Sequence, residues 1–318
     1  MKKLIVGSRK SRMAIAQTNE FIDAFLEKNS EFKRENVHIK TITTSGDANK
    51  KDRLDLIGGK GLFVREIEQM LLDQTIDVAI HSMKDMPTIM TPGLKIAAWL
   101  PRSDHREAFV NNNACKIMEL KPNSIIGTSS IRRRSQVLNL RSDLNIKLIR
   151  GNVDTRIDKL DGGEYDALIL GYGGIKRLSL ESRVAHVFNI NEILPPACQA
   201  SIGVQTINED SELISAISKT NKISSATIGL AERKVLEALH ANCNSPIGVF
   251  ASIHDSVINL KVEIFSHDGK DKYVAEVSGN IEESISLANE AASMIIDQVG
   301  IDYVNNLDIL KDDFNYSP

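Results

Sequence analysis

Hydrophobic positions along the first two-thirds of the chain switch repeatedly between the period of a strand and the period of a helix. Short apolar or β-branched runs alternate with stretches in which apolar residues recur every three or four positions, the spacing of one helix face. The expected strands are 4–8, 37–44, 76–81, 94–100, 124–127, 146–149 and 167–170, and the expected helices are 13–26, 62–72, 131–140 and 153–160. This alternation favours α/β layers with largely parallel sheets.

The last third of the chain has a different order of elements. Helical periodicity at 226–239 and 281–299 flanks three alternating runs that indicate strands at 247–253, 258–265 and 273–277. This α-β-β-β-α order predicts a small α+β domain. The polar tail 308–318 is expected to be loosely held.

Prolines and polar runs mark the places where the chain is expected to pass between domains. Pro101 with the polar run 103–106 marks one crossing, and Pro195-Pro196 marks another. We expect a first α/β lobe at 1–100 with 200–218, a second α/β lobe at 105–194, and the α+β domain at 222–318.

Composition narrows the function classes. The formal net charge is -3, which disfavours a general nucleic-acid-binding protein. No run approaches 18 consecutive apolar residues, and the N-terminus has too short an apolar stretch for a signal peptide, so we expect a cytoplasmic protein. The three cysteines are far apart and match neither a disulfide framework nor a zinc-binding spacing.

Arginine is concentrated in one part of this acidic chain. Six arginines fall within 25 positions: Arg132, Arg133, Arg134, Arg141, Arg150 and Arg156. The hydroxyl-rich run 127–130 precedes the first of them between a strand and a helix, where exposed N–H groups and the helix N-terminus favour anions. A second such stretch is 150–156, and both lie at strand ends, so they predict one polyanion site. The alternative is a solvated basic helix face.

Four other segments carry candidate chemistry. Lys84-Asp85 follows a strand, where the carboxylate can stabilise a cation or move a proton; the alternative is an exposed turn. Arg9 and Ser11 follow the first strand, and Ser11 is also a candidate helix cap. The glycine-rich turn 58–63 lacks the Walker A spacing. Cys243, between a helix and a strand, is either a nucleophile or attachment point, or a small buried hydrophobe.

Taken in order, these segments resemble the hydroxymethylbilane synthases, also called porphobilinogen deaminases, over nearly the whole chain. The motifs that carry the resemblance are GGKGLF at 58–63, HSMKD at 81–85, GTSSIRRR at 127–134, RGNVDTR at 150–156, YDALILGYGGIKRL at 165–178 and ERKVLEALHANCNSPIG at 232–248.

The resemblance implies a fold, a cofactor and a reaction. The fold has two lobes like type II periplasmic binding proteins and a small third domain that presents Cys243. A dipyrromethane cofactor is bound to that cysteine through a thioether, and no metal is implied. The substrate is porphobilinogen, four molecules of which are joined with loss of ammonia and released by hydrolysis as a linear tetrapyrrole. The family resemblance also suggests a monomer, with no nucleic-acid or membrane partner.

The resemblance assigns roles by matching positions in the motifs. Asp85 matches the catalytic aspartate, which also contacts the cofactor. The matching positions that hold cofactor carboxylates are Lys84, Thr128, Ser129, Ser130, Arg132, Arg133 and Arg156. The matching positions that engage substrate or the growing chain are Arg9, Ser11, Arg150, Arg156 and Arg177. Lys60 and Phe63 lie on a loop expected to cover the active site.

Several residues depart from the family pattern. Ala241-Asn242 stands before the cysteine where two small residues are usual, and Ser245 replaces a β-branched residue. Arg12 stands where proline is common, and Asp154 where glycine is common. The segment 195–201 replaces a Gly-Gln-Gly pattern, which should restrict backbone freedom at an expected hinge. Two alternatives remain: a catalytically degenerate paralogue, and a two-lobed anion-binding protein without chemistry.

Overall fold

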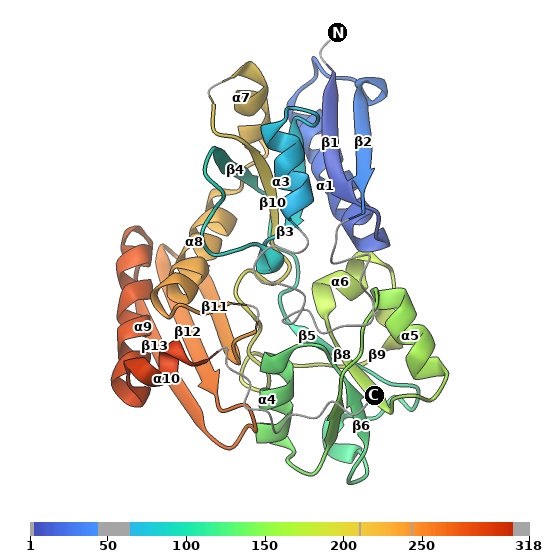
Figure 1. Ribbon diagram of the computed structural model, residues 1–318, viewed down its shortest axis with the longest axis vertical. Helices are drawn as coiled ribbons and strands as arrows, with labels where there is room; N and C mark the ends of the chain where they lie inside the picture. Colours follow the sequence, from blue (N-terminus) through green and yellow to red (C-terminus); the bar gives the residue numbers. More distant parts are fainter. Residues whose placement is uncertain (1–2, 44–63, 210, 243, 308–318) are drawn as a thin grey trace. The chain divides into compact units, whose positions relative to one another are not determined.

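The computed structural model describes residues 3–43, 64–209, 211–242 and 244–307 (Figure 1). The chain forms two compact units, Met1–Ser103 with Ala200–Thr227, and Asp104–Gln199 with Ile228–Pro318. The first unit is one α/β lobe. The second unit contains another α/β lobe and a smaller antiparallel sheet covered by helices. The domain bounds expected from the sequence remain a prediction.

The first lobe is built on a five-stranded sheet of order β2-β1-β3-β10-β4. Its elements are β1 (Leu4–Arg9), α1 (Arg12–Lys28), η1 (Arg34–Asn36), β2 (Val37–Ile42), α3 (Arg65–Leu72), β3 (Val78–Ser82), η2 (Met83–Asp85), β4 (Leu94–Trp99), β10 (Ile202–Ile207) and α7 (Glu212–Ser218). Strands β2, β1 and β3 are parallel, and β10 runs antiparallel to both of its neighbours. Apolar residues of α1 and α7 cover one face of the sheet, and those of α3 cover the other (Figure 1).

The second lobe has a five-stranded sheet of order β7-β6-β8-β5-β9. Its elements are β5 (Glu107–Val110), η3 (Ile117–Glu119), β6 (Ile125–Gly127), α4 (Ile131–Leu140), β7 (Asn145–Lys147), α5 (Val153–Asp161), β8 (Ala167–Gly171), α6 (Tyr172–Arg177), η4 (Glu181–Arg183) and β9 (Val184–Val187). Strands β7, β6 and β8 are parallel, and β5 is antiparallel to β8 and β9. Each lobe therefore has three parallel strands, then one antiparallel strand, then an edge strand.

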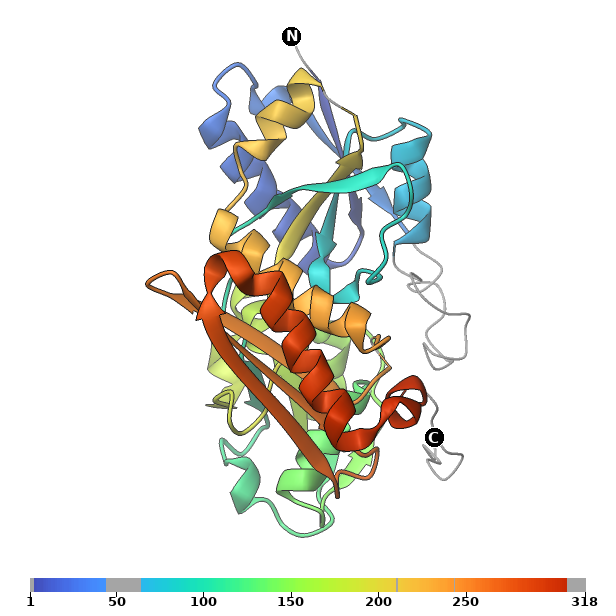
Figure 2. The same ribbon diagram turned by 90° about the vertical axis from the view of Figure 1, so that its left-hand side faces the viewer.

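The third sheet is antiparallel, in the order β11-β12-β13. Its elements are α8 (Ile223–Ala238), β11 (Ile247–His254), β12 (Val257–Phe265), β13 (Lys272–Asn280), η5 (Ile281–Glu283), α9 (Ser284–Val299) and α10 (Ile301–Asn305). Figure 2 shows α9 lying across this sheet, where Leu287 and Ile295 join its apolar core. The β12–β13 turn contacts α4 of the second lobe, because the Asn139 amide donates to the Gly269 carbonyl at 2.8 Å.

The two α/β lobes repeat one strand-joining motif. The Asp77 carboxylate, just before β3, accepts from the Ile5 N–H at 2.6 Å, and the Asp77 N–H donates to the Ile5 carbonyl at 2.9 Å. In the second lobe the Asp166 carboxylate accepts from the Ile125 N–H at 2.6 Å, and the Asp166 N–H donates to the Ile125 carbonyl at 2.9 Å. These paired aspartates set equivalent residue positions in the two lobes.

The helices before these aspartates also end alike. Gln74 after α3 has φ 52° and Gly163 after α5 has φ 77°. In both lobes the N–H of the next residue donates to a carbonyl in the helix, Thr75 to Met70 at 2.9 Å and Glu164 to Lys159 at 3.1 Å. Left-handed residues of this kind commonly end helices. The correspondence between the lobes therefore extends back from the strands into α3 and α5.

Most expected elements are confirmed, including all three strands and both helices of the last third. The part of the helix expected at 62–72 that is described begins at Arg65. Two central strands, β5 and β10, were not expected. Each has polar residues facing a buried environment, Glu107 in β5 and Gln205 in β10, so neither shows apolar-polar alternation. Because both are antiparallel, the sheets are mixed rather than largely parallel.

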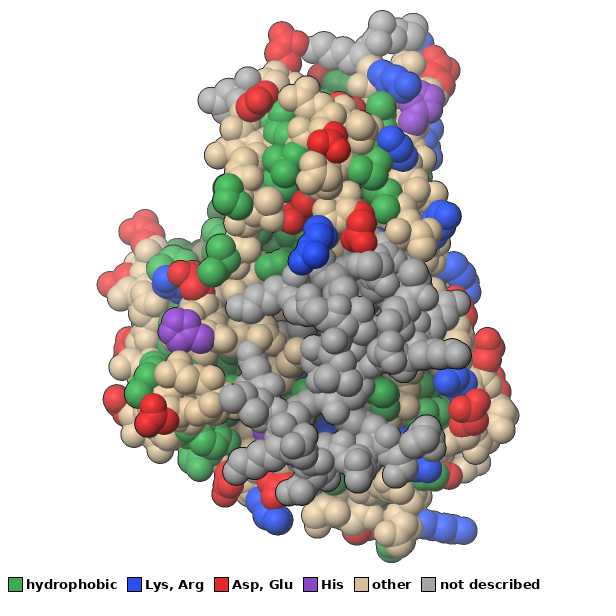
Figure 3. Space-filling view, viewed as in Figure 1, with side chains coloured by type: hydrophobic (Ala, Val, Ile, Leu, Met, Phe, Trp, Pro, Cys, Tyr) green, Lys and Arg blue, Asp and Glu red, His purple; other side chains and the backbone are tan. Residues whose placement is uncertain are grey.

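No helix among the described residues is long and apolar enough to span a membrane. On the face shown in Figure 3, the acidic and basic side chains of the described residues are interspersed. The two arginines that open α4, in contrast, are buried.

Candidate active site

The first lobe places four of the expected site residues at the carboxyl ends of two adjacent strands. Arg9 ends β1, and Ser11 follows it and caps α1, its hydroxyl accepting from the Ala14 N–H at 3.2 Å. Lys84 and Asp85 lie in η2 directly after β3, with both side chains exposed. Because β1 and β3 are paired, the two turns lie at one edge of the sheet, where open α/β sheets bind ligands.

The end of β3 is held on both sides before the chain reaches Asp85. Ser82 and the Gln17 side chain of α1 are hydrogen-bonded at 2.8 Å. The Met83 N–H donates to the Ser201 carbonyl at 3.0 Å. Lys84 therefore follows two residues whose positions are fixed by neighbouring elements.

A buried chain of polar side chains crosses the face of β3 that α3 covers. His81 Nε2 lies 2.9 Å from Gln205 Oε1, and Gln205 Nε2 donates to Glu68 Oε1 at 2.7 Å. Thr91 donates to the other Glu68 oxygen at 2.6 Å. His81, Gln205 and Glu68 are all buried. Burial lowers the pKa of His81 to about 4, and the positive charge of Arg9 acts in the same direction, so the imidazole is neutral near pH 7.

In the second lobe the hydroxyl-rich turn 128–130 organises the start of α4. The buried Thr128 hydroxyl accepts from the Ser130 N–H at 3.1 Å, and the Ser130 hydroxyl caps the helix by accepting from the Arg133 N–H at 3.4 Å. Arg156 Nη2 donates to the Ser129 hydroxyl at 3.4 Å, and Arg156 Nε donates to the Gly151 carbonyl at 2.8 Å. The structure thus brings the two arginine-bearing turns together, as expected for one anion site.

Arg132 and Arg133 converge on one buried carboxylate, that of Glu107 on β5. Arg133 binds it through Nε at 3.0 Å and Nη2 at 2.7 Å, and Arg132 binds it through Nη2. Arg132 Nη1 also donates to the Leu194 carbonyl at 2.6 Å. All three charged side chains are buried. Glu107 lies outside the sequence motifs of the site, and its one signal in the sequence is its position next to the crossing at 101–106.

In this cluster two guanidinium groups face the Glu107 carboxylate, and the charge of Glu263 also acts on Arg132. Burial lowers the pKa of Arg132 to about 10, partly offset by Glu107, so Arg132 stays protonated at neutral pH. Its Nε atom is buried, and the described residues give it no hydrogen-bond partner. A buried cation with an unused donor fits a ligand with several carboxylates, such as dipyrromethane.

The remaining arginines differ in position. Arg150 follows β7, at the same edge of the sheet as the 128–130 turn, and Arg177 ends α6, the helix that follows β8. Arg141, part of the arginine-rich stretch of sequence, serves another purpose. It donates to the carbonyls of Ile117, Met118 and Leu120 at 3.1–3.2 Å, and so fixes the η3 turn.

The segment 194–199, which precedes the return to the first lobe, is tied to several elements of the second unit. The Pro195 carbonyl accepts from the Val249 N–H at 2.9 Å. The Cys198 N–H donates to the buried Glu232 carboxylate at 2.6 Å. Cys198 and Ala200 have φ values of 59° and 65°, in the left-handed region that favours glycine. Both residues therefore have a strained backbone, and the restriction expected at a hinge here stays a prediction.

Lys60, Phe63 and Cys243 lie outside the described residues, so their roles stay predictions. The residues that flank Cys243 form a turn. The Asn242 N–H donates to the Ser245 hydroxyl at 3.0 Å, and the Asn244 N–H donates to the Asn242 side chain at 2.8 Å. Two of the residues that depart from the family pattern therefore supply the hydrogen bonds that close this turn.

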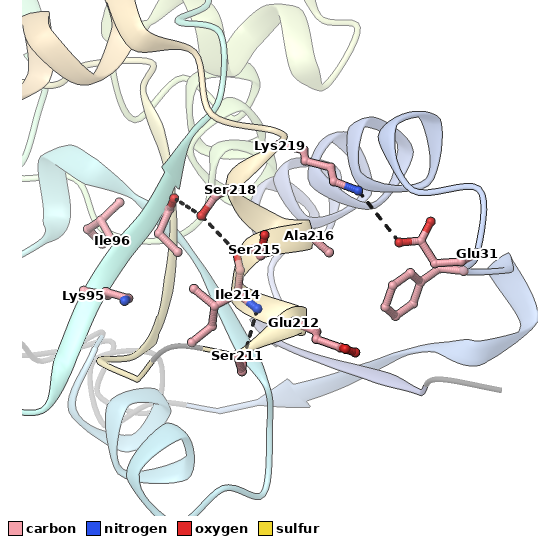
Figure 4. A pocket seen from close by; sticks show the side chains of 12 residues that line it. Glu31, Lys95, Ile96, Ser211, Glu212, Ile214, Ser215, Ala216, Ser218 and Lys219 are labelled. Atoms are coloured by element: carbon pink, nitrogen blue, oxygen red, sulfur yellow. Dashed lines mark hydrogen bonds and ion pairs between the residues drawn. The ribbon is translucent and has the colours of Figure 1, made fainter.

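A cavity of about 960 Å³ lies elsewhere on the first lobe (Figure 4). It is bordered by α7, the start of β4 and the loop after α1, and its charged side chains include Lys95, Lys219 and Glu31. Since β4 runs parallel to β3, its start lies at the sheet edge opposite to Asp85. The cavity is thus separate from the turns that carry the expected site residues.

The fold and site define a class: a two-lobed α/β protein with arginines and hydroxyls at its strand ends and a small antiparallel third part. Two family models match the chain, "Porphobilinogen deaminase, dipyromethane cofactor binding domain" over residues 4–215 and "Porphobilinogen deaminase, C-terminal domain" over residues 226–297. The chain belongs to the porphobilinogen deaminase family.

Relatives of full length agree with this membership. The chain is 39% identical to the porphobilinogen deaminase of Lysinibacillus sphaericus over 98% of its own length and 99% of that protein. It is 36% identical to that of Staphylococcus carnosus over 94% and 96%. Among solved structures it is similar to the Bordetella pertussis BvgS VFT2 domain, with a TM-score of 0.40, 14% identity, and coverage of 73% of this chain and 89% of that chain.

Proposed function

We propose that this chain is a hydroxymethylbilane synthase, a transferase that joins four porphobilinogen molecules head to tail, releases ammonia and frees the linear tetrapyrrole by hydrolysis. The observation that carries the proposal is the match of the cofactor-binding family model over 4–215, the range that holds every described strand-end turn of the site. We further propose that it works in the cytoplasm as a monomer.

The second lobe would hold the carboxylates of the cofactor and the substrate. Each porphobilinogen unit carries an acetate and a propionate, so its chain is a polyanion. Arg132 and Arg133 offer two guanidinium groups beside Glu107, and the Ser129 hydroxyl and the start of α4 add donors. When bound through Cys243, the dipyrromethane supplies the pyrrole carbon to which the first substrate is joined.

In this proposal Asp85 is the carboxylate that acts on the reacting pyrroles. It is exposed at the end of β3 and is preceded by fixed residues. There it stabilises the positive charge that develops on the substrate as ammonia leaves, and accepts the proton that the joined ring loses. Lys84 beside it binds a carboxylate, and Arg9 and Ser11 at the adjacent β1 end engage the growing chain.

The test is the intact mass of the purified protein under denaturing conditions. We expect a mass above that of the sequence by one dipyrromethane, lost in Cys243→Ala. Incubation with porphobilinogen should add further pyrrole increments to the parent and release the linear tetrapyrrole. A bare mass that stays unchanged after incubation with porphobilinogen would contradict the proposal.

A further inference from the structure

The buried polar chain of the first lobe is costly for a protein core. Glu68, Gln205 and His81 are withdrawn from water, and within the described part of the chain their mutual hydrogen bonds and the Thr91 hydroxyl compensate for this. A core site of this size is normally filled by apolar side chains. The first lobe therefore has polar side chains at core positions where packing does not require them.

The second lobe shows how the same topology fills the same positions. Counted from the paired aspartates, His81 lies four residues after Asp77, as Leu170 lies four residues after Asp166. Gln205 is opposite Ala79 on the antiparallel strand, two residues after the aspartate, and its counterpart there is Val110, opposite Leu168.

Glu68 has its counterpart on α5. It lies nine residues before Asp77, and Ile157 lies nine residues before Asp166. Leu170, Val110 and Ile157 are all buried, and the first two belong to one apolar cluster. The same topology thus forms with three aliphatic side chains at these positions.

We infer that Glu68, Gln205 and His81 are positioning residues that fix the end of β3 and thereby the direction of the Asp85 carboxylate. This inference rests on the proposed function. The hydrogen bonds among His81, Gln205 and Glu68 connect β3 to α3 through β10 on one face of the sheet. On the other face the Ser82–Gln17 hydrogen bond connects β3 to α1. Asp85 follows within four residues of His81, in the turn that these bonds hold.

The hydrogen bonds also define the state of His81. Both neighbours of Glu68 donate to its carboxylate, so the Gln205 amide turns its NH2 group to Glu68 and its oxygen to His81. That oxygen needs a hydrogen from Nε2, so His81 is the neutral imidazole with its hydrogen on Nε2. These hydrogen bonds hold each of the three side chains in one orientation, a rigidity that aliphatic packing does not impose.

The sharpest test replaces the three polar side chains of the first lobe by the aliphatic side chains found at the matching positions of the second lobe. The triple variant Glu68→Ile, Gln205→Val, His81→Leu removes the three buried polar side chains together, so none of the three is left unsatisfied by the loss of another, and the half-buried Thr91 hydroxyl loses its acceptor. Ile157→Val in the second lobe is the matched control, since it perturbs the equivalent core by one buried methylene without touching the site. Cofactor mass, melting temperature, kcat and KM for porphobilinogen are measured for each.

We expect the triple variant to fold and to carry its cofactor, but to lose kcat by at least about tenfold with KM little changed. The control should keep the parent kcat. A triple variant with parent stability and parent kcat would overturn the inference. If the parent itself carried no dipyrromethane and did not convert porphobilinogen, the proposed function would fail instead, so the two failures are distinguishable.

Gln205→Glu supplies a second test that preserves side-chain size. Among the described residues, the charge that acts on His81 is that of Arg9 on β1, while β10 contributes the neutral Gln205, whose amide separates His81 from Glu68 of α3. A carboxylate at 205 should favour protonated His81, which NMR of its ring proton detects directly. We expect a new inflection in the pH profile of kcat at the pH where this ring titrates. Titration of the ring with an unaltered kcat profile would overturn the inference.

Discussion

The two α/β lobes share a strand order, paired aspartates and serine-capped helices, but they bury their polar groups in different places. The first lobe buries them beneath the end of β3, where His81, Gln205 and Glu68 meet, and opens α1 with Met13 and Ala14. The second lobe has aliphatic residues beneath the end of β8. Counted from the capping serines, its Arg132 and Arg133 match Met13 and Ala14.

This difference separates what the fold requires from what the site requires. Positions that are aliphatic in one lobe and polar in the other are not fixed by topology, because the same topology accepts both. The first lobe concentrates its buried polarity behind the candidate catalytic carboxylate. The second lobe concentrates buried charge behind the candidate carboxylate-binding turn. Each lobe thus supports a different part of the proposed reaction.

Asp85→Asn should have the largest effect. The amide keeps the size of the side chain but removes its negative charge and its capacity to accept a proton, so kcat should fall by a factor of about 100 or more. The melting temperature should change little, because Asp85 is exposed. Steady-state kinetics and thermal unfolding check both parts. Parent-like turnover would mean that the catalytic carboxylate lies elsewhere.

Arg133→Ala, which introduces the residue found at the matching position 14 of the first lobe, should have the second-largest effect. It leaves Glu107 buried with Arg132 alone and should reduce the free energy of unfolding by about 3 kcal/mol. Cofactor content, measured by intact mass, should also fall.

Arg141→Ala is the control for this variant. Arg141 comes from the same stretch of sequence but binds Asp143 and the carbonyls of the η3 turn, so cofactor content should be unaffected. Full cofactor content in Arg133→Ala would argue against the second lobe as the carboxylate site.

A smaller effect concerns pH. The pKa of His81 is about 4 in the folded chain and 6.5 in its ordinary state, so the unfolded chain binds a proton that the folded chain does not between these values. Stability from this residue is complete above pH 6.5 and is lost as pH falls toward 4, by up to about 3 kcal/mol.

His81→Leu, which copies Leu170, should remove this contribution. Urea unfolding at pH 7 and pH 4.5 gives the change in the free energy of unfolding between these pH values for the parent and for the variant. Contributions of the other titrating groups cancel when the two changes are subtracted. Equal pH dependence of the two proteins would show that His81 is not held neutral.

The smallest change in stability is expected at Ala200. Here the comparison is between the two segments that connect the lobes, 101–106 and the return crossing 195–201. Only the return crossing has non-glycine residues with positive φ among its described residues, and the segment around 101–106 has none. Ala200→Gly should relieve the left-handed strain and raise the free energy of unfolding by about 0.5 kcal/mol, after the greater entropy of the unfolded glycine is subtracted. Ala97→Gly, in a β4 residue of ordinary φ, should instead destabilise.

The sequence predicts much of this architecture because most elements have clean periodicity. It failed at β5 and β10, whose buried Glu107 and Gln205 interrupt the apolar pattern. Their partners, Arg132 for one and His81 for the other, are 25 and 124 positions away, so no local pattern indicates that these polar residues are satisfied.

The candidate site divides in the same way. The hydroxyl turn at 128–130 and the strand-end positions of Arg9 and Asp85 follow from motif and periodicity. The pairing of Arg132 and Arg133 with Glu107 does not, nor does the purely local role of Arg141, because an arginine in a sequence does not identify its partner. The likeness of the two lobes was also invisible, since it lies in strand order and hydrogen bonds rather than in repeated residues.

Strand β10 has a consequence for synthesis of the chain. It lies between β3 and β4 in the sheet, yet it is made only after the whole second lobe, about 100 residues beyond β4. At translation rates of about 5–20 residues per second, β4 waits about 5–20 s on the ribosome for its neighbour. The second lobe has all of its strands first, and the lobe that begins the chain is the later of the two to close.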